Sequence, residues 1–175
     1  AGVAGFALRV GQQITPNAHG SLGLAFLSSQ TVDSALKLLE KYAETQTDLV
    51  QFSVQRDNHC TRLVIEESRP LGSAYISVIE LALSTVWFAL RLLSAGQLPC
   101  QQVSLRYPCT EYLAVYREIF GCAIINDSNE NALHIPNTAL GMRLLLGNPA
   151  ALQRALSQCE QEMQKHIHQE SLAVR

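Results

Sequence analysis

The 175-residue sequence has no excess of positive charge. It contains 13 Lys and Arg residues against 15 Asp and Glu residues, which gives a formal net charge of -2. The basic residues are also scattered along the chain. Proteins that bind nucleic acid through their own surface usually carry a clustered basic patch, so the composition argues against such a surface. If the protein acts on DNA, we expect the contacts to come from a part that is absent from this sequence.

Motifs for metal binding and for disulfide frameworks are also lacking. The five cysteines form no C-x-x-C pair, and their number is odd, so neither a zinc site nor a set of structural disulfides is indicated. His166 and His168 are two positions apart near the end of a predicted helix, where they point in different directions and cannot share one ion. We expect no metal and no cofactor.

No long uninterrupted apolar segment predicts a membrane span. The most apolar stretch, residues 76–93, contains Glu80 and Arg91, and the first ten residues lack the charged segment that opens a signal peptide. We therefore expect a soluble, cytoplasmic protein with no membrane partner.

Catalytic motifs are missing as well. There is no G-x-S-x-G sequence, and Ser28 and Ser29 precede a helix start, where hydroxyl groups usually cap the backbone. Gly20 and Gly23 lack the Lys-Ser/Thr pair of a phosphate-binding loop, so we attribute them to close helix packing. We predict no catalytic residues.

The periodicity of apolar residues predicts an α+β domain over residues 1–147 and a separate C-terminal helix over 148–175. Thr31, Thr110 and Asn148 are expected to cap helices. The expected fold is a mostly antiparallel or mixed sheet packed against a long buried crossover helix, with further helices. Predicted helices span 22–27, 32–42, 73–94, 110–121 and 149–167, and predicted strands span 6–10, 50–55, 61–67, 101–107, 122–125 and 131–135, with the last two paired across the turn at 126–130.

The long helix at 73–94 is apolar nearly all round, so we expect it to be buried, with its few polar residues on one stripe. A buried, unpaired Glu80 would cost several kcal/mol in order of magnitude. Glu80 is therefore exposed, paired with Arg62 or Arg106 from a facing strand, or lining a wet cavity. The stripe is either an exposed sliver of a covered helix or the polar wall of a ligand pocket. In the second case the candidate ligand-binding residues are Glu80, Ser84, Trp87, Arg106, Tyr75 and Arg9.

The last helix has a narrow apolar seam at heptad-like spacing, which suits packing along one partner helix in the same domain or in a second copy. The candidate dimerisation residues on this seam are Leu152, Leu156, Cys159 and Met163.

Several motifs in this order resemble one family. Residues 20–42 read G-x-x-G-x-A-x-x-S-S-x-T-x-x-x-A-L-x-L-L-x-K-Y, and the shorter motifs are E-L-A at 80–82, R-L-L-S-A-G at 91–96, E-Y-x-x-x-Y-x-x-x-F-G at 111–121 and N-A-L-x-I-P at 131–136. Together they resemble the N-terminal effector domain of AraC-type transcriptional regulators, in the arabinose-binding-domain branch that includes the ornithine utilisation regulator.

The resemblance implies a bacterial regulator in which this domain binds a small-molecule effector and forms a homodimer. DNA would be bound only by a separate C-terminal helix-turn-helix domain that is absent from this chain. Two other functions stay open. One is a small enzyme that uses a buried Glu80 as acid or base. The other is a dimerisation scaffold without a ligand, which a domain lacking a cavity of about 300 Å³ or more would favour.

Overall fold

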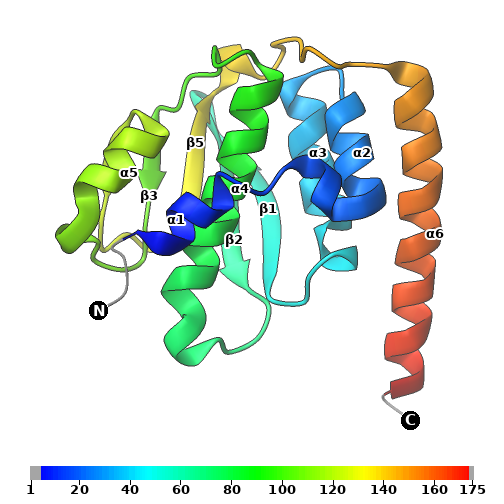
Figure 1. Ribbon diagram of the computed structural model, residues 1–175, viewed down its shortest axis with the longest axis horizontal. Coiled ribbons are helices and arrows are strands. Elements are labelled where there is room, and N and C mark those ends of the chain that lie inside the picture. The colour runs from blue at the N-terminus through cyan, green and yellow to red at the C-terminus, as the bar shows by residue number, and fades with distance from the viewer. Residues whose placement is uncertain (1–4, 174–175) are drawn as a thin grey trace.

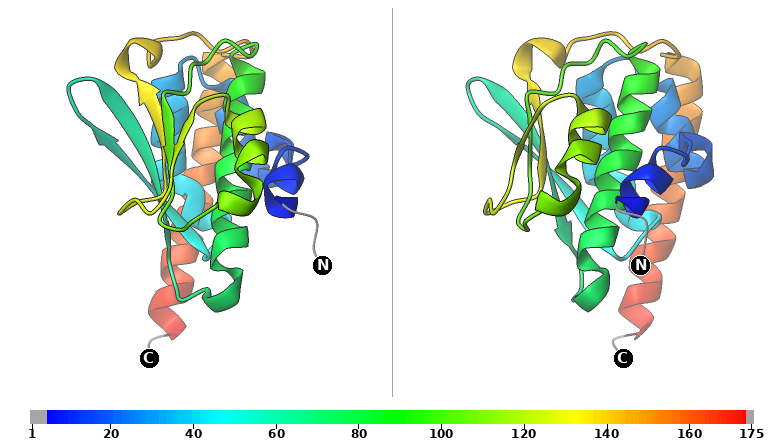
Figure 2. Two further views of the ribbon diagram at one scale, coloured as in Figure 1. Left: turned by 90° about the vertical axis from the view of Figure 1, so that its left-hand side faces the viewer. Right: turned by 60° about the vertical axis from the view of Figure 1, so that its left-hand side comes forward.

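The computed structural model describes residues 5–173 and has the predicted α+β architecture. Helices gather on one face of a five-stranded sheet, and none of the described residues forms a helix on the other face (Figures 1 and 2). The helices are α1 (Phe6–Gly11), α2 (Gly20–Ser28), α3 (Val32–Tyr42), α4 (Tyr75–Leu93), α5 (Leu113–Phe120) and α6 (Pro149–Ala173). The strands are β1 (Val50–Arg56), β2 (Cys60–Glu67), β3 (Gln102–Ser104), β4 (Ala123–Ile125) and β5 (Ala132–Pro136).

The sheet is mixed, with strand order β1-β2-β5-β3-β4. All neighbours are antiparallel except β3 and β4, which run parallel and are connected through α5. The predicted pairing of residues 122–125 with 131–135 is therefore wrong. Leu133 and Ile135 of β5 are fully buried, which suits a central strand, whereas Ala123 and Ile125 of β4 are exposed, which suits an edge.

The predicted N-terminal strand is also wrong, because residues 6–11 form the helix α1. Leu8 and Gly11, three positions apart, are its buried residues, and α1 packs against α4. A Cβ atom added at Gly11 would lie 1.9 Å from the Oγ atom of Ser84. The missing side chain thus permits close contact between the two helices. Alternation over five residues did not distinguish a strand from one and a half turns of helix.

Most predicted helix boundaries are confirmed. Thr31 caps α3 in a capping box with Ser34, and the Oδ1 atom of Asn148 accepts a hydrogen bond from the backbone N–H of Ala151 at 3.0 Å. Thr110 does not cap a helix. It begins a 3-10 turn, η4 (Thr110–Tyr112), and α5 starts only at Leu113 without a side-chain cap.

The helix α4 forms the centre of the hydrophobic core. Ile79, Leu83 and Leu90 are fully buried, and α4 contacts α1, β1 and β2. Within the described residues, 72–93 is the one helical stretch long and apolar enough to cross a membrane by length and composition, and half of it is buried inside the molecule. A helix at the centre of a core has the same composition.

The helix α6 packs along α2 through a second apolar cluster. Ala155, Cys159 and Met163 of α6 are buried against the chain's own α2 and α3. The hydroxyl of Tyr42 donates a hydrogen bond to Glu160 at 2.8 Å at the edge of this contact. Beyond Met163 the helix continues past α2 and α3 (Figure 1).

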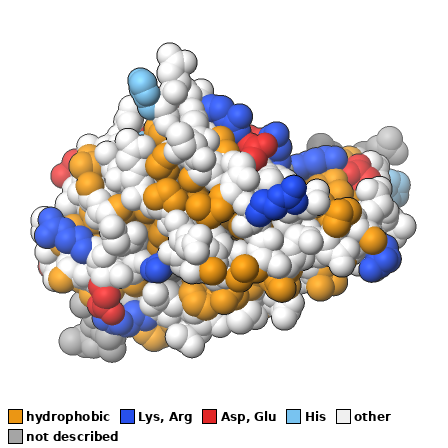
Figure 3. All heavy atoms as spheres, turned by 90° about the horizontal axis from the view of Figure 1, so that it is seen from above, with side chains coloured by type: hydrophobic (Ala, Val, Ile, Leu, Met, Phe, Trp, Pro, Cys, Tyr) orange, Lys and Arg blue, Asp and Glu red, His pale blue; other side chains and the backbone are white. Residues whose placement is uncertain are grey.

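One end of the molecule carries apolar surface. Leu92, Leu145 and Leu146 are at least half exposed where α4 ends, and the backbone N–H of Leu145 bonds to the carbonyl of Leu93. Figure 3 looks onto this end and shows apolar side chains near its middle, with basic and acidic side chains interspersed around them. The face in this view shows no field of a single charge sign.

Candidate functional site

An apolar cavity of about 210 Å³ lies between α2, α3, β1 and α4. Helix α4 contributes Val78, Ala82, Thr85 and Ala89, which follow 4-3-4 spacing and therefore share one face. Their side chains are small for a core helix, and this leaves space between α4 and the elements opposite. Leu22 and Phe26 of α2, Leu39 of α3, and Val50 and Phe52 of β1 complete most of the wall.

The backbone around Gly23 shapes one side of the cavity. A Cβ atom at Gly23 would lie 1.7 Å from the carbonyl oxygen of Pro16 in η1 (Pro16–His19), so η1 packs directly on α2. The expectation that this glycine serves close packing is confirmed. Gly20 has another role, because its φ of +52° lies in the left-handed region and the nearest atom to an added Cβ is 4.0 Å away.

Burial changes along the cavity. Phe26, Leu39 and Ala89 are buried, whereas Gln46 is exposed and Ile14 is partly exposed. The cavity is therefore closed near the C-terminal half of α4 and open near the segment that follows η2 (Ala43–Thr45).

The lining contains few polar side chains, namely His19, Gln46, Thr47 and Thr85. Burial lowers the pKa of His19, which keeps its imidazole neutral near pH 7. None of the described residues that line the cavity is Asp, Glu, Lys or Arg. The cavity can surround an apolar group but offers no charged partner.

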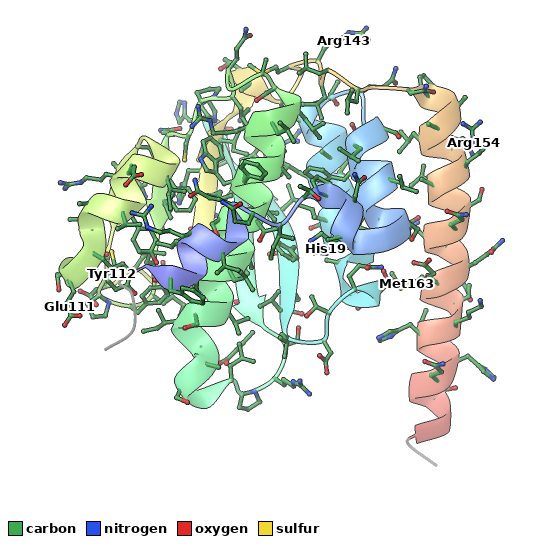
Figure 4. The ribbon with its side chains drawn as sticks, viewed as in Figure 1. His19, Glu111, Tyr112, Arg143, Arg154 and Met163 are labelled. Atoms are coloured by element: carbon green, nitrogen blue, oxygen red, sulfur yellow. The ribbon has the colours of Figure 1, made fainter. Side chains whose placement is uncertain are left out.

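Glu80 lies on the opposite side of α4, in a cluster of tyrosines. Its Oε1 atom accepts hydrogen bonds from the hydroxyls of Tyr112 at 2.6 Å and Tyr116 at 2.8 Å. The residue is 3% exposed, and burial raises the pKa of its carboxyl group, although the two hydrogen bonds oppose the shift. Figure 4 shows Tyr112 on one side of α4 and His19 on the other.

The predicted arginine partners of Glu80 are wrong. Arg62 forms an ion pair with Glu130 at 2.8 Å, and Arg106 is exposed. The carboxyl group is instead satisfied by the two tyrosine hydroxyls. These come from α5 and from the turn before it, so no spacing rule within α4 could have identified them.

Other members of the predicted stripe also have structural partners. Trp87 donates from Nε1 to the carbonyl of Ile119 at 2.9 Å, and the hydroxyl of Ser84 donates to the carbonyl of Glu80 at 2.8 Å. The buried part of the stripe, formed by Glu80, Ser84 and Trp87, is therefore neither an exposed sliver of the helix nor a wall of the cavity. It is the surface on which α1 and α5 pack.

Tyr75 and Arg106 meet at the side chain of Asn131, whose Oδ1 atom accepts a hydrogen bond from the backbone N–H of Arg106 at 3.0 Å. Tyr75 accepts a hydrogen bond from the side-chain amide of Asn131 at 2.8 Å, and Arg9 pairs on the surface with Glu118 at 3.5 Å. None of the six predicted ligand-binding residues, all within the described part of the chain, lines the apolar cavity. The sequence signal that could have indicated this cavity is the face of small residues on α4, a helix whose other apolar side chains are bulky.

The predicted dimerisation residues face inward. Cys159 and Met163 are 0% and 8% exposed in the contact with α2 and α3, and Leu152 and Leu156 are partly buried against the same cluster (Figure 4). Of the two partners that the sequence left open for this seam, the structure places the chain's own domain against it.

Comparisons with known proteins agree with this architecture. Residues 1–144 match the family described as the arabinose-binding domain of AraC transcription regulators, N-terminal. The chain is 30% identical over 168 residues to the ornithine utilization regulator of Pseudomonas aeruginosa, across 96% of this chain and 50% of that regulator.

A solved structure shows the same fold. The crystal structure of the transcriptional regulator CdpR from Pseudomonas aeruginosa superposes with a TM-score of 0.75 at 20% identity, over 93% of this chain and 56% of CdpR. The chain therefore spans about half the length of either relative.

Proposed function

This chain belongs to the family of arabinose-binding domains at the N-terminus of AraC transcription regulators, and from this premise we propose that it senses a small-molecule effector and dimerises. Residues 1–147 would form the sensing domain, and residues 148–175 would carry dimerisation or lead to a linker. DNA would be bound by a further domain, as the greater length of the relatives suggests. The protein would act in the cytoplasm of a bacterium.

The observation that carries this proposal is the apolar cavity between α2, α3, β1 and α4. Protein interiors are close-packed, so a space of about 210 Å³ between core elements costs free energy through the contacts that its apolar wall lacks. A ligand that fills the cavity would recover part of this free energy, and the opening near Gln46 gives it a route of entry.

The arrangement also supports a route from the cavity to α6. Leu22 and Ala43 line the cavity and also belong to the apolar cluster that holds α6. A ligand that displaces these two side chains would change how α6 packs against α2 and α3. Helix α6 leads toward the C-terminus of the chain. Such a ligand regulates only if it binds two arrangements of α6 with different affinity.

Dimerisation would use the part of α6 that projects beyond Met163, because its inner seam is already covered. Ile167 on this part is 52% exposed. We expect a homodimer by light scattering coupled to size exclusion at about 100 μM, and a shift toward monomer in Ile167→Lys. Leu24→Lys, at a 49% exposed site on α2, is the matched control and should remain dimeric. A monomeric wild-type chain at this concentration would contradict the dimerisation proposal.

Effector binding is tested by a thermal-shift screen of a metabolite library on three proteins. Ala82→Phe places a ring inside the cavity, and Ala150→Phe makes the same change at an exposed position on α6. We expect at least one metabolite to stabilise the wild type and Ala150→Phe but not Ala82→Phe. Stabilisation of all three proteins alike, or of none, would overturn the proposal.

Two alternatives stand beside this proposal, namely a dimerisation scaffold without a ligand and a small enzyme. The cavity is smaller than about 300 Å³, so its volume alone favours the scaffold, whereas its apolar lining and its opening favour a small ligand. The enzyme alternative needs a buried Glu80 with a raised pKa and a second group in hydrogen-bond reach, and Glu80 with the tyrosine hydroxyls around it has these features. Glu80 does not line the apolar cavity, however, so a substrate held in that cavity would not meet its carboxyl group. The ornithine utilization regulator and CdpR, by their names, are regulators as well.

A further inference from the structure

We infer that the effector is an uncharged amphiphile with a short aliphatic chain, held in the cavity between α2, α3, β1 and α4. The inference rests on the proposed function and specifies the chemical class of its ligand. The family description and the ornithine utilization regulator point instead to a sugar or a charged amino acid. The lining, the shape and the charge of the cavity each distinguish an uncharged amphiphile from a sugar and from a charged amino acid.

The lining excludes a strongly polar ligand. The side chains that meet a ligand in the interior are Leu22, Phe26, Leu39, Val86 and Ala89. Each polar group of a ligand buried among them without a hydrogen bond would lose affinity by roughly tenfold or more. A sugar has hydroxyls around its whole ring, and ornithine carries three charged groups at neutral pH, so neither can be placed there without such losses.

The shape favours a chain over a bulky ring system. The wall follows α4 from Val78 to Ala89, which is a distance of about 16 Å at about 1.5 Å per residue. The volume of about 210 Å³ is below the roughly 300 Å³ at which pockets for drug-sized ligands begin. A small volume spread along several helical turns suits a short aliphatic chain.

The polar groups near the opening favour an uncharged head group. Gln46 and Thr47 lie on the exposed side of the cavity, and the Oγ1 atom of Thr47 accepts from the backbone N–H of Leu49 at 3.1 Å, which leaves its own proton free to donate. His19 is neutral near pH 7, as described above, so the lining holds no cation for a carboxylate.

Acidic residues flank the same segment. Glu44 precedes Gln46, and Asp48 follows Thr47, and both are exposed. Asp48 is paired with Arg69 at 2.9 Å. A carboxylate head would have to sit beside these acids without a lysine or arginine in the lining, which disfavours fatty acids relative to alcohols, ketones or amides of the same length.

Four probes on the 175-residue chain separate the classes. They are 1-octanol, octanoate, octylamine and L-ornithine, compared by isothermal titration and thermal unfolding at pH 7.5. We expect 1-octanol at ten times its dissociation constant to raise Tm by about 3–6 °C. Octanoate should bind at least tenfold more weakly, because the opening offers acidic residues but no lysine or arginine in the lining. Octylamine should also bind at least tenfold more weakly, because no Asp or Glu lines the cavity and the nearby Asp48 is already paired with Arg69. L-ornithine should not bind.

Variants show whether the probe occupies this cavity. Ala82→Phe and Thr85→Phe fill it from two positions on α4, so either one remains informative if the other fails to fold. The response to 1-octanol should be lost in both and kept in Ala150→Phe. Binding of 1-octanol that survives both substitutions would be adventitious and would overturn the inference.

The remaining outcomes separate this inference from the proposed function. If L-ornithine or another polar metabolite binds and Ala82→Phe abolishes its binding, the sensor remains and the ligand class is wrong. Tighter binding of octanoate or octylamine than of 1-octanol would likewise contradict an uncharged head. If no compound of the library or of this set binds, both proposals fail together and the scaffold alternative stands.

Discussion

The hydroxyl of Tyr116 donates a hydrogen bond of 2.8 Å to the Oε1 atom of Glu80, and both residues are buried. Tyr116 also contacts the hydroxyl of Tyr107 at 3.0 Å. A carboxyl group in the core is thus held by neutral donors and not by a cation. This relationship connects α4 with α5 and gives the fold a group whose charge depends on pH.

Replacement of Glu80 by glutamine should flatten the dependence of stability on pH. Burial raises the folded-state pKa of Glu80 above its ordinary value of 4.5, so the folded chain holds this proton to a higher pH than the unfolded chain does. The contribution of the group to stability is therefore greatest below its ordinary pKa and falls as the pH rises toward the folded-state pKa. Denaturant unfolding at several values between pH 4.5 and 7.5 should show wild type losing stability relative to Glu80→Gln.

The control for this experiment is Glu111→Gln, a change of the same kind at an exposed position next to Tyr112 (Figure 4). Its stability should follow that of the wild type across the whole range. The two proteins must be compared as a difference, because burial lowers the pKa of His19 and His134 below the ordinary value of 6.5. The unfolded chain therefore binds more protons at these groups than the folded chain, and their contribution to stability rises with pH, opposite to that of Glu80. Parallel curves for wild type and Glu80→Gln would contradict the assignment.

The two tyrosines should differ in what their hydroxyls contribute. Tyr116 is 0% exposed, whereas Tyr112 is partly exposed. Tyr116→Phe removes one of the two hydrogen bonds to Glu80 and the contact with the Tyr107 hydroxyl, at a buried position, and should destabilise the chain by about 1–3 kcal/mol. Tyr112→Phe should cost less, because water can reach its position. Equal losses in urea unfolding would show that the buried hydroxyl has no special role.

Residues with local signals were predicted well from the sequence. Thr31 and Asn148 mark helix starts through backbone chemistry that involves only a few neighbours. The pairing of β4 was not predictable in this way, because it depends on the crossover through α5. The turn residues between β4 and β5 indicated a hairpin of these two short strands. In the structure β5 lies in the centre of the sheet, with Leu133 buried, and β4 pairs with β3 instead.

The candidate site illustrates the same limit. The sequence predicted correctly that the polar residues of α4 share one stripe. The role of Glu80 in that stripe depends on Tyr112 and Tyr116, which lie more than 30 positions away in the sequence. The cavity is defined by what is missing between helices. Ala82 and Ala89 are ordinary helix residues in sequence, and only the placement of α2 and α3 opposite them leaves a space.

Gly23→Ala should be strongly destabilising although alanine favours helices. Its Cβ would lie 1.7 Å from the carbonyl oxygen of Pro16, so η1 would have to move away from α2. Overpacking of this kind costs about 1–3 kcal/mol, and we expect Tm to fall by several degrees. Gly141→Ala is the matched control, since an added Cβ there meets no atom within 4 Å. Equal Tm values for the two variants would mean that the contact with η1 is loose.

Leu22→Ala should loosen α6 as well as the cavity. Leu22 is 5% exposed and packs both in the cavity wall and in the cluster that holds Ala155 and Cys159. Truncation of a buried leucine costs about 2–5 kcal/mol, and hydrogen exchange should accelerate in residues 155–163 more than in the central strand β5. Leu24→Ala changes a half-exposed leucine on the same helix and should leave exchange in α6 unaltered. If both variants leave α6 equally protected, then α2 does not connect the cavity to α6, and a ligand would need another path to reach the C-terminal helix.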